Sequence, residues 1–429
     1  MLHIAVLGYG VVGSGVVRVL SENRRQIEKK AEQPVNVRRV LDIRDFPGDE
    51  TVAPLLTHQY ADILNDPEIR IVAEAMGGVE PAYTYLKQAL LSGRHVCTSN
   101  KELVSLHGAE LLAAARENAV SFLFEASVGG GIPVVRPMNL ALTTDEVVAV
   151  AGILNGTTNY VLSQMAASGT DFHETLREAQ ALGYAEKNPA DDVEGHDACR
   201  KLAILLSLAA GRHVDYRTVH TEGIARLTRA DFDFARAFGY NIKLLADGRI
   251  RGAEVEALTA PMLVHERHPF AAVPDVFNGI LVQARMTDSV MFFGRGAGKL
   301  PTAGAVVSDI VDIAKNLDRH IPHPWSREAM PVADPAGYVR KNMVRVTCGK
   351  GNGSSAPHRR KKAMEAVCRA SGGAEAAFRE LPAYPGQLAW ITPPENEAET
   401  ALTLAELAVS EDIQTVSPAL RIYEPVIFS

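Results

Sequence analysis

Cysteine is scarce in this sequence, with four residues in 429, at Cys97, Cys199, Cys348 and Cys368. They lie far apart and none belongs to a CxxC pair, so the pattern indicates neither a metal site nor a disulfide framework. A reducing compartment fits this cysteine usage best.

Long apolar runs are also missing. The longest, Leu202–Ala210, has nine residues including Ser207, whereas a membrane-spanning helix needs ~18 or more. Met1–Leu7 lacks the basic start of a signal peptide and runs straight into a glycine loop. No internal repeat or low-complexity tract is present. We therefore expect a soluble, cytoplasmic protein.

An excess of positive charge is absent as well. Lys and Arg number 44 against 51 Asp and Glu, which gives a formal net charge of −7 and argues against a nucleic-acid surface. The one basic run, Arg359–Lys362, is short and is expected to be a solvated helix face. What is present is an ordinary globular composition, 47% hydrophobic and 22% charged, in a chain long enough for two or three domains.

The segment Gly183–Leu208 combines several carboxylates with a lysine on a predicted buried helix. Asp197 and Lys201 are four residues apart, so they project from nearly the same side of a helix, and aliphatic side chains continue that side. Burial would shift the protonation of such a pair and suit it to proton transfer. The alternative, which the spacing alone favours, is an ordinary exposed ion pair worth ~0.3–0.5 kcal/mol.

The start of this helix admits more than one interpretation. Asn188 followed by Pro189, or either of Asp191 and Asp192, can cap its N-terminus, and Gly211 closes its end. The carboxylates gathered near the start are Glu186, Asp191, Asp192 and Glu194. They could bind a substrate ammonium or a cation, or simply complement the helix dipole.

The N-terminus carries the pattern of a dinucleotide-binding loop. A predicted buried strand, His3–Leu7, is followed at once by GYGVVG at 8–13 and then by a helical pattern. The first glycine permits a tight turn, the second lets the backbone approach a pyrophosphate, and the third allows close helix–strand packing. Amides at the helix N-terminus would face the phosphates. The alternative is a glycine-rich turn in another kind of α/β domain.

Three further strands are predicted at Val35–Leu41, Ile69–Ala75 and His95–Thr98, with a helix over Pro81–Ser92 between the last two. Ligands bind at the carboxyl ends of strands in an open parallel sheet, so the residues after each strand matter most. Asn100 with Lys101 follows the last strand and is expected on the nicotinamide side.

The residues after the second strand decide which dinucleotide binds. Asp42, Arg44 and Asp45 stand there. An acidic side chain accepts a bond from a free ribose 2′-hydroxyl, whereas arginine favours a 2′-phosphate. Both types are present, so both NAD and NADP fit the sequence.

Six sequence blocks, in order, resemble the homoserine dehydrogenase family. They are GYGVVG (8–13), SNKELV (99–104), EASVGGGIP (125–133), GILNGTTNYVL (152–162), GYAEKNPADDVEGHDACRKLAI (183–204) and FFGRGAGKLPTAGAVVSDI (292–310). The fourth and fifth are far more specific than the glycine loop. The resemblance implies reversible hydride transfer between NAD(P)H and the aldehyde of L-aspartate 4-semialdehyde, giving L-homoserine, a step of threonine and methionine biosynthesis.

The resemblance also assigns roles to residues. Lys201 would be the general acid that protonates the developing alkoxide, with Lys101 a second catalytic lysine at the substrate and nicotinamide. Asp197, also placed among the catalytic residues, would bind the substrate ammonium and hydroxyl together with Glu186 and Gly183. An ammonium near the carbonyl stabilises negative charge on oxygen and then donates a proton. The implied cofactor contacts are Gly8, Gly10, Val11, Val12, Gly13, Arg44, Ser99, Asn100, Lys101 and Gly298.

The block at 125–133 resembles the family's monovalent-cation loop. By that resemblance the Glu125 side chain and the carbonyls of Val128, Gly130 and Ile132 would surround a sodium ion. Hard oxygen ligands suit such an ion, and glycines let carbonyls turn inward. The alternative is that Gly129–Gly131 is only an interdomain hinge. NGTTN at 155–159 similarly reads either as a turn lining the active site or as a simple turn between a strand and a helix.

The expected architecture is α/β, with a Rossmann-type dinucleotide-binding domain, an α+β substrate and dimerisation domain, and a C-terminal ferredoxin-like, ACT-like domain. The expected bounds are 1–130 plus about 302–320 for the first, 131–301 for the second, 321–335 for a proline-rich linker, and 336–429 for the third. In the middle domain strands are predicted at Val147–Leu154, Arg251–Thr259 and Gly279–Met286, and helices at Tyr160–Ala167, Asp171–Leu182 and Asp231–Leu245. Helix Ala303–Leu317 would return to the first domain.

Six elements are predicted in the last hundred residues: strand Tyr338–Cys348, helix His358–Ala370, strands Ala374–Leu381 and Gly386–Pro393, helix Glu395–Ala408, and strand Ile413–Tyr423. The order βαββαβ is ferredoxin-like, and longer family members carry an ACT domain of this topology, which is associated with amino-acid feedback. GKGNGSSAPHRR replaces the usual turn here, so an amino-acid effector such as threonine and an oligomerisation module without a ligand both fit. A homodimer or homotetramer is expected.

Two other functions compete with this one. Oxidation of a semialdehyde to an acyl phosphate would need a thiol nucleophile, and Cys97 lies beside the cofactor loop, although its strand pattern favours buried core. A catalytically silent amino-acid sensor would have lost its catalytic residues, whereas Lys101, Glu186, Asp197 and Lys201 are all present.

Overall fold

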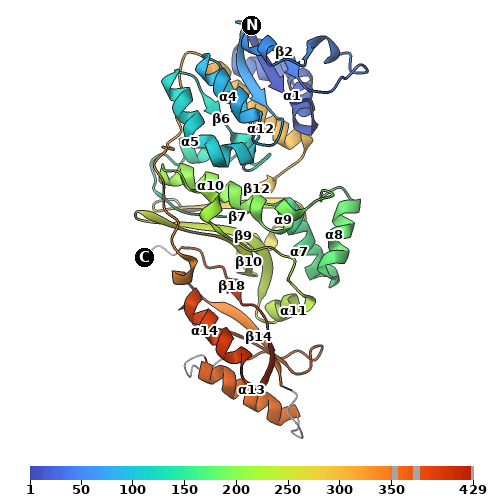
Figure 1. Cartoon of the computed structure of the whole chain (residues 1–429), viewed down its shortest axis with the longest axis vertical. Coiled ribbons are helices and arrows are strands. Elements are labelled where there is room, and N and C mark those ends of the chain that lie inside the picture. Colours follow the sequence, from blue (N-terminus) through green and yellow to red (C-terminus); the bar gives the residue numbers. More distant parts are fainter. Residues whose placement is uncertain (350–355, 371–376, 427–429) are drawn as a thin grey trace.

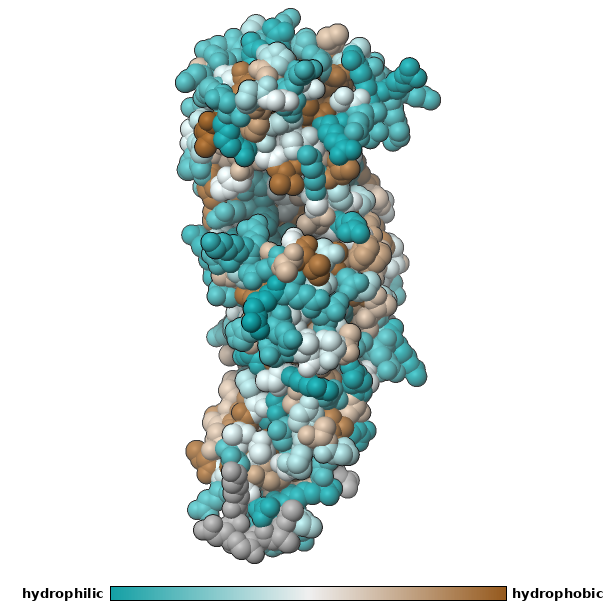
Figure 2. Space-filling model, turned by 90° about the vertical axis from the view of Figure 1, so that its right-hand side faces the viewer, coloured by the Kyte–Doolittle hydropathy of each residue, from teal (hydrophilic) through white to brown (hydrophobic). Residues whose placement is uncertain are grey.

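The computed structural model describes residues 1–349, 356–370 and 377–426. The molecule is elongated, with a parallel sheet and its helices at one end, a mixed sheet in the middle and a smaller α/β unit at the other end (Figure 1). On the face shown in Figure 2, apolar residues are scattered among hydrophilic ones. No helix in the described ranges is both long enough and apolar enough to cross a membrane.

The first sheet is parallel and has six strands in the order β3-β2-β1-β4-β5-β6. They are β1 (Leu2–Leu7), β2 (Val35–Leu41), β3 (Leu56–Thr57), β4 (Ile69–Glu74), β5 (His95–Thr98) and β6 (Phe122–Leu123). Helices cover the sheet, so its strands are short runs of buried aliphatic residues. The four predicted strands are confirmed. The strand order reverses between β1 and β4, and this reversal places a ligand crevice outside their carboxyl ends.

A helix from late in the chain packs against this first sheet. Helix α12 (Lys299–Lys315) lies against α1 (Val11–Glu22) (Figure 1). A Cβ at Gly15 would lie 2.8 Å from the carbonyl oxygen of Lys299, so glycine permits this close approach. The helix was predicted to start at Ala303 but begins four residues earlier.

The middle of the molecule is built on antiparallel strands in the order β12-β11-β7-β9-β10. They are β7 (Val147–Ile153), β9 (Tyr240–Arg251), β10 (Glu254–His265), β11 (Phe277–Ala284) and β12 (Asp288–Arg295). Helix α10 (His196–Ala210) lies across β7 and β9. Gly248 makes room for it, since a Cβ there would lie 2.6 Å from the Leu206 side chain. Further helices are α7 (Gly156–Ser168), α8 (Phe172–Ala181) and α11 (Arg229–Ala237).

Two helix predictions in this region are wrong. The predicted helix Asp231–Leu245 is α11 followed by strand β9, with Gly239 at φ +82° between them. Twelve residues of β9 pair with β10, and this pairing outweighs the helical spacing of its apolar residues. The helix predicted to begin near Asn188 is also two helices, α9 (Ala190–Val193) and α10, separated by Gly195 at φ +87°.

The C-terminal unit contains α13 (Ala356–Ala370) and α14 (Glu397–Ala408) with strands β13 (Val339–Arg340), β14 (Asn342–Cys348), β15 (Gln387–Ile391), β16 (Glu395–Asn396), β17 (Ile413–Val416) and β18 (Leu420–Ile422). Strand β14 pairs antiparallel with β15 and β17. The predicted last strand, Ile413–Tyr423, is in fact two strands, β17 and β18, with Pro418 in the gap between them. The predicted strand Ala374–Leu381 lies partly outside the described residues, as does most of the GKGNGSSAPHRR segment, and Arg379 makes a single bridge with Ala389.

The middle and C-terminal sheets are continuous, because β18 pairs in parallel with β10 and antiparallel with β14. The chain after β18 lies along the middle sheet. Arg249 donates to the Glu424 carbonyl at 2.6 Å, and Gln283 exchanges two hydrogen bonds with the Val426 backbone.

Candidate active site

Lys101 lies at the carboxyl edge of the parallel sheet. It is the first residue of helix α5 (Lys101–Glu117), which follows β5 directly. The Asn100 side chain caps this helix by accepting a hydrogen bond from the Leu103 amide at 3.0 Å. The cap therefore fixes the position of Lys101 at the edge where a dinucleotide is expected.

Asp197 and Lys201 lie on helix α10 and are buried, with 2% and 8% of their surfaces exposed. The Lys201 ammonium donates to Asp197 Oδ2 and to the Leu154 carbonyl, each at 2.8 Å. Lys101 forms an ion pair with the other Asp197 oxygen, Oδ1. One carboxylate thus joins a lysine of the first sheet to a lysine of the middle region, and the alternative of an exposed helical ion pair is wrong.

Burial and charge shift the protonation of this cluster in opposite directions for the two lysines. Burial lowers the pKa of Lys201, and the positive charge of Lys101 lowers it further against the attraction of Asp197. Lys101 also loses hydration, but Asp197 outweighs this and raises its pKa. Burial would raise the pKa of Asp197, yet the two ammonium groups hold it well below its ordinary value. Lys201 is therefore the readier proton donor of the two.

Asn155 and Asp192 complete the cluster. The Asn155 amide donates to Asp192 at 2.7 Å and to Asp197 at 2.8 Å, while its oxygen accepts from the Thr158 amide and caps helix α7. Burial and the neighbouring charge of Asp197 raise the pKa of Asp192. From the sequence, Asp192 was only one of several candidate carboxylates, and Asn155 was only the first residue of the NGTTN block, interpreted either as a turn lining the active site or as a simple turn. The signal that could have found Asn155 is its position as N-cap just after a buried strand.

Glu186 and Gly183 are not brought into this cluster. Both lie exposed in the segment between α8 and α9. The Glu186 carbonyl accepts a bond from Gln180 at 3.0 Å, whereas its carboxylate forms no ion pair or hydrogen bond with any part of the chain that is described. Their assignment to the substrate remains a prediction.

The glycine loop has the shape that a pyrophosphate requires. Gly8 has φ +87°, and a Cβ there would lie 2.9 Å from the Ala75 carbonyl oxygen. A Cβ at Gly13 would lie 1.8 Å from the Gly8 carbonyl oxygen, whereas nothing lies near Gly10 on its open side. No side chain caps helix α1, so its first amides are left for phosphate oxygens. These residues fit a dinucleotide.

Asp42 and Arg44 form a compact pair at the end of β2. The Asp42 carboxylate accepts from the Tyr9 amide at 2.7 Å and from Arg44 Nε and Nη2, each at 2.9 Å. These bonds hold the pKa of Asp42 well below its ordinary value. The Arg44 side chain is 57% exposed, so its guanidinium borders the space beyond the strand.

The other predicted cofactor contacts lie on elements that meet this edge. Gly298 has φ +125° and precedes the uncapped N-terminus of α12. The Ser99 amide donates to the Glu74 carbonyl at 3.3 Å. Val11 and Val12 open helix α1, and Val11 is 67% exposed.

The loop at 125–133 offers mixed support for a cation. Glu125 is buried, and its carboxylate accepts from the amides of Val134, Val135 and Arg136 at 2.7–2.9 Å. It therefore caps helix α6 (Val135–Leu140). The carbonyls of Val128, Gly130 and Ile132 accept no hydrogen bond from the described residues, which fits the donor set of a hard cation.

The hinge interpretation of the same loop also has support. The Gly131 amide donates to the Arg295 carbonyl at 3.2 Å. A Cβ at Gly130, which has φ +57°, would lie 2.2 Å from the Gly296 carbonyl oxygen. The two segments that connect the first sheet to the middle sheet therefore touch each other here.

Two other features lie away from the cluster. Cys97 is fully buried in β5, as its strand pattern predicted, and burial raises the pKa of its thiol.

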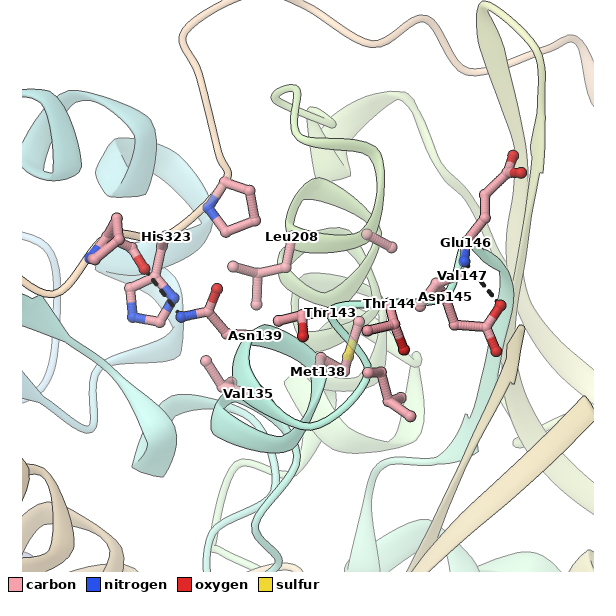
Figure 3. A pocket seen from close by; sticks show the side chains of 14 residues that line it. Val135, Met138, Asn139, Thr143, Thr144, Asp145, Glu146, Val147, Leu208 and His323 are labelled. Atoms are coloured by element: carbon pink, nitrogen blue, oxygen red, sulfur yellow. Dashed lines mark hydrogen bonds between the residues drawn. The ribbon is translucent and has the colours of Figure 1, made fainter. Parts of the chain in front are cut away.

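A cavity of about 730 Å³ has Asn139 and His323 at one end and Asp145 and Glu146 at the other (Figure 3). None of the predicted site residues lines it.

Comparison with known proteins matches one family profile to the region of the first sheet and a second profile to the region of the middle sheet. The family profile "Homoserine dehydrogenase, NAD binding domain" matches residues 8–125, and the profile "Homoserine dehydrogenase" matches residues 133–311. The homoserine dehydrogenase of Bacillus subtilis is 40% identical over 319 residues, which are 74% of this chain and 73% of that protein. The one from Mycobacterium leprae is 37% identical over 98% of this chain and 97% of that protein. The crystal structure of a homoserine dehydrogenase from Thiobacillus denitrificans matches with TM-score 0.88 and 32% identity, over 99% of this chain and 98% of that one.

Proposed function

The chain belongs to the homoserine dehydrogenase family, and on that premise we propose that Lys201 is its general acid in the NAD(P)H-dependent reduction of L-aspartate 4-semialdehyde to L-homoserine. The protein is an NAD(P)-dependent oxidoreductase. What supports the assignment of Lys201 is one observation: the buried Asp197 carboxylate joins Lys201 to Lys101 at the edge of the dinucleotide-binding sheet.

The hydrogen bonds of Lys201 leave one proton for the substrate. An ammonium has three donors, and two of them bind Leu154 and Asp197. We propose that the third faces the aldehyde oxygen. Bound nicotinamide supplies the hydride to the carbonyl carbon. As negative charge develops on the oxygen, the Lys201 ammonium stabilises it and then transfers its proton, which completes the alcohol.

The remaining charges would hold the substrate. Lys101 keeps two donors beyond its contact with Asp197 and would stand between the cofactor edge and the substrate. Asp192, whose carboxylate is held by Asn155, is a partner for the substrate ammonium, with Glu186 and Gly183 approaching from the exposed segment before α9. Asp197 orients Lys201 and keeps it charged.

A direct assay tests the proposal. Purified protein is mixed with L-homoserine and NADP or NAD, and then with aspartate semialdehyde and NADPH or NADH, while absorbance of the reduced nicotinamide is followed. Turnover in both directions, independent of phosphate and retained by Cys97→Ala, is the expected result. Turnover that needs phosphate would indicate acyl-phosphate chemistry, and no turnover with bound cofactor would indicate the silent sensor.

Three finer assignments belong to the same proposal. Sodium bound by Glu125, Val128, Gly130 and Ile132 would stabilise the connection between the sheets. A homodimer or homotetramer would show in light scattering on a sizing column. An amino-acid effector of the C-terminal, ACT-like unit would show as inhibition by millimolar threonine; a ligand-free oligomerisation module would leave activity unchanged.

A further inference from the structure

Glu74 is a fully buried carboxylate at the strand reversal of the first sheet. It is the last residue of β4 and has no exposed surface. Strand β4 lies between β1, which carries the glycine loop, and β5, which carries Lys101. An ionisable group is costly to bury unless its surroundings satisfy it, so its partners show what it does there.

The Glu74 carboxylate accepts from three donors, two in the turn after β4 and one at the end of β5. Its Oε1 accepts from the Met76 amide at 2.7 Å and, more weakly, from the Gly77 amide at 3.4 Å. Its Oε2 accepts from the Thr98 hydroxyl at the end of β5. A carboxylate only accepts, so it complements three donors in a way that a neutral amide does not. These bonds favour the charged form of Glu74 and oppose the burial that raises its pKa.

The bonds continue from Thr98 to Lys101. The Thr98 hydroxyl accepts from the Asn100 amide at 2.9 Å. The Asn100 side chain donates to the Gly78 carbonyl at 2.6 Å and caps α5, whose first residue is Lys101. The turn after β4 and the turn after β5 are therefore linked through the Glu74 carboxylate and through the Asn100 side chain, in addition to the backbone bond from the Ser99 amide to the Glu74 carbonyl.

The turn that follows Glu74 packs on the glycine loop. The turn that begins at Ala75 packs so closely on Gly8 that a Cβ there would lie 2.9 Å from both the Ala75 carbonyl oxygen and the Met76 Cα. Any displacement of this turn would therefore move the backbone on which Gly8 of the dinucleotide-binding loop packs. The Glu74 carboxylate thus links the turn after β4, which packs on Gly8, to the end of β5.

We propose that Glu74 is a positioning residue that fixes the turns on which the dinucleotide lies and the helix start that carries Lys101. This inference rests on the proposed function, because it gives Lys101 its place beside cofactor and substrate. Glu74 itself touches neither the substrate nor the reacting atoms. Its contribution is expected in cofactor affinity and in turnover.

The test compares four variants. Glu74→Gln keeps the shape but leaves the Thr98 hydroxyl without an acceptor or an amide without a partner. Thr98→Val removes the hydroxyl, and Thr98→Ser keeps it. Val72→Ala, in the buried core of the same strand and without a polar side chain, is the matched control for lost stability alone. The dissociation constant of NADPH is measured by fluorescence titration, and kcat, KM and Tm are measured for each variant.

We expect Glu74→Gln and Thr98→Val to weaken NADPH binding by up to about tenfold, the value reached when the whole effect of losing one hydrogen bond to a charged group falls on the turns that carry the cofactor, and to lower kcat as Lys101 shifts. Thr98→Ser should bind NADPH as the wild-type protein does, and Val72→Ala should lower only Tm. If Glu74→Gln lowers Tm as Val72→Ala does while NADPH affinity and kcat stay at the wild-type values, Glu74 is purely structural and the inference is overturned.

Two other outcomes are covered by the same set. If Glu74→Gln does not fold, the comparison of Thr98→Val with Thr98→Ser decides the question, since equal NADPH affinity in the two would overturn the inference. If the wild-type protein binds NADPH but does not turn over homoserine, the proposed function fails while the affinity comparison still tests Glu74.

Discussion

Replacement of Lys201 by methionine is the most direct perturbation of the proposed chemistry. Methionine fills nearly the same volume on helix α10 but has no ammonium, so the packing around it is preserved. Two hydrogen bonds are lost, to Leu154 and Asp197, together with the free proton proposed for the substrate. Cofactor binding should remain, because the glycine loop and Arg44 are untouched.

The size of the effect follows from the geometry. A positioned general acid contributes ~10²–10⁴-fold to turnover, which at ~1.36 kcal/mol per tenfold is ~2.7–5.4 kcal/mol of the activation barrier. Removing one partner of a buried ion pair costs ~3–5 kcal/mol of stability. Asp197 keeps Lys101, so we expect ~3 kcal/mol, the lower end. This is a large part of the ~5–15 kcal/mol that stabilises a typical domain.

A second variant separates catalysis from stability. In Lys201→Met combined with Asp197→Asn, the fully buried carboxylate that keeps only Lys101 as its ionic partner becomes neutral, while Lys101 is partly exposed, so Tm should recover in part while kcat stays low. Steady-state kcat is measured well below Tm, with NADPH affinity as the check on folding. If Lys201→Met alone retains kcat close to wild type, Lys201 has no part in proton transfer. If the double variant regains turnover, the loss in the single variant came from instability.

Three further results are expected. Arg44→Ala should lower kcat/KM with NADPH about tenfold, because a 2′-phosphate loses a charge-assisted bond, and leave NADH little changed; an equal fall with both cofactors would contradict this. Burial lowers the pKa of His323 to about 4, below the ~6.5 of an unfolded chain, so the unfolded state binds more protons in this interval and stability falls as pH drops from ~6.5. His323→Phe, which keeps the packing on Phe124, should flatten the dependence of Tm on pH between 5 and 7, and an unchanged slope would show that His323 does not titrate this way. Sodium chloride should raise Tm above that in choline chloride for the wild-type protein but not for Glu125→Gln; no difference in the wild type would remove the cation site.

The sequence predicts the first sheet well, because its strands are short apolar runs that end in glycines or polar turns. The i,i+4 spacing of Asp197 and Lys201 correctly places them on one helix face. Spacing within one helix says nothing about a partner from another sheet, so the contact of Asp197 with Lys101 emerged only from the fold. The same limit hid Glu74, whose partners Met76 and Thr98 belong to the turn after β4 and to the end of β5.

The errors also have physical causes. Apolar residues from Phe232 to Leu245 satisfy a helical period and a buried strand alike, and only the pairing of β9 with β10 selects the strand. Gly195 lies inside the predicted helix as if it were an ordinary helical residue, yet its left-handed backbone divides that helix in two.

The continuity of β10 with β18 bears on how the chain can be shortened. A protein cut before Leu420 would leave the backbone amides and carbonyls of Met262 and Leu263 without their neighbours, and such a bare strand margin invites pairing with other chains and aggregation. Deletion of the last hundred residues would therefore do more than remove the C-terminal unit. The shortened enzyme would need a protected edge strand, for example one that carries charged residues or a proline, to remain soluble.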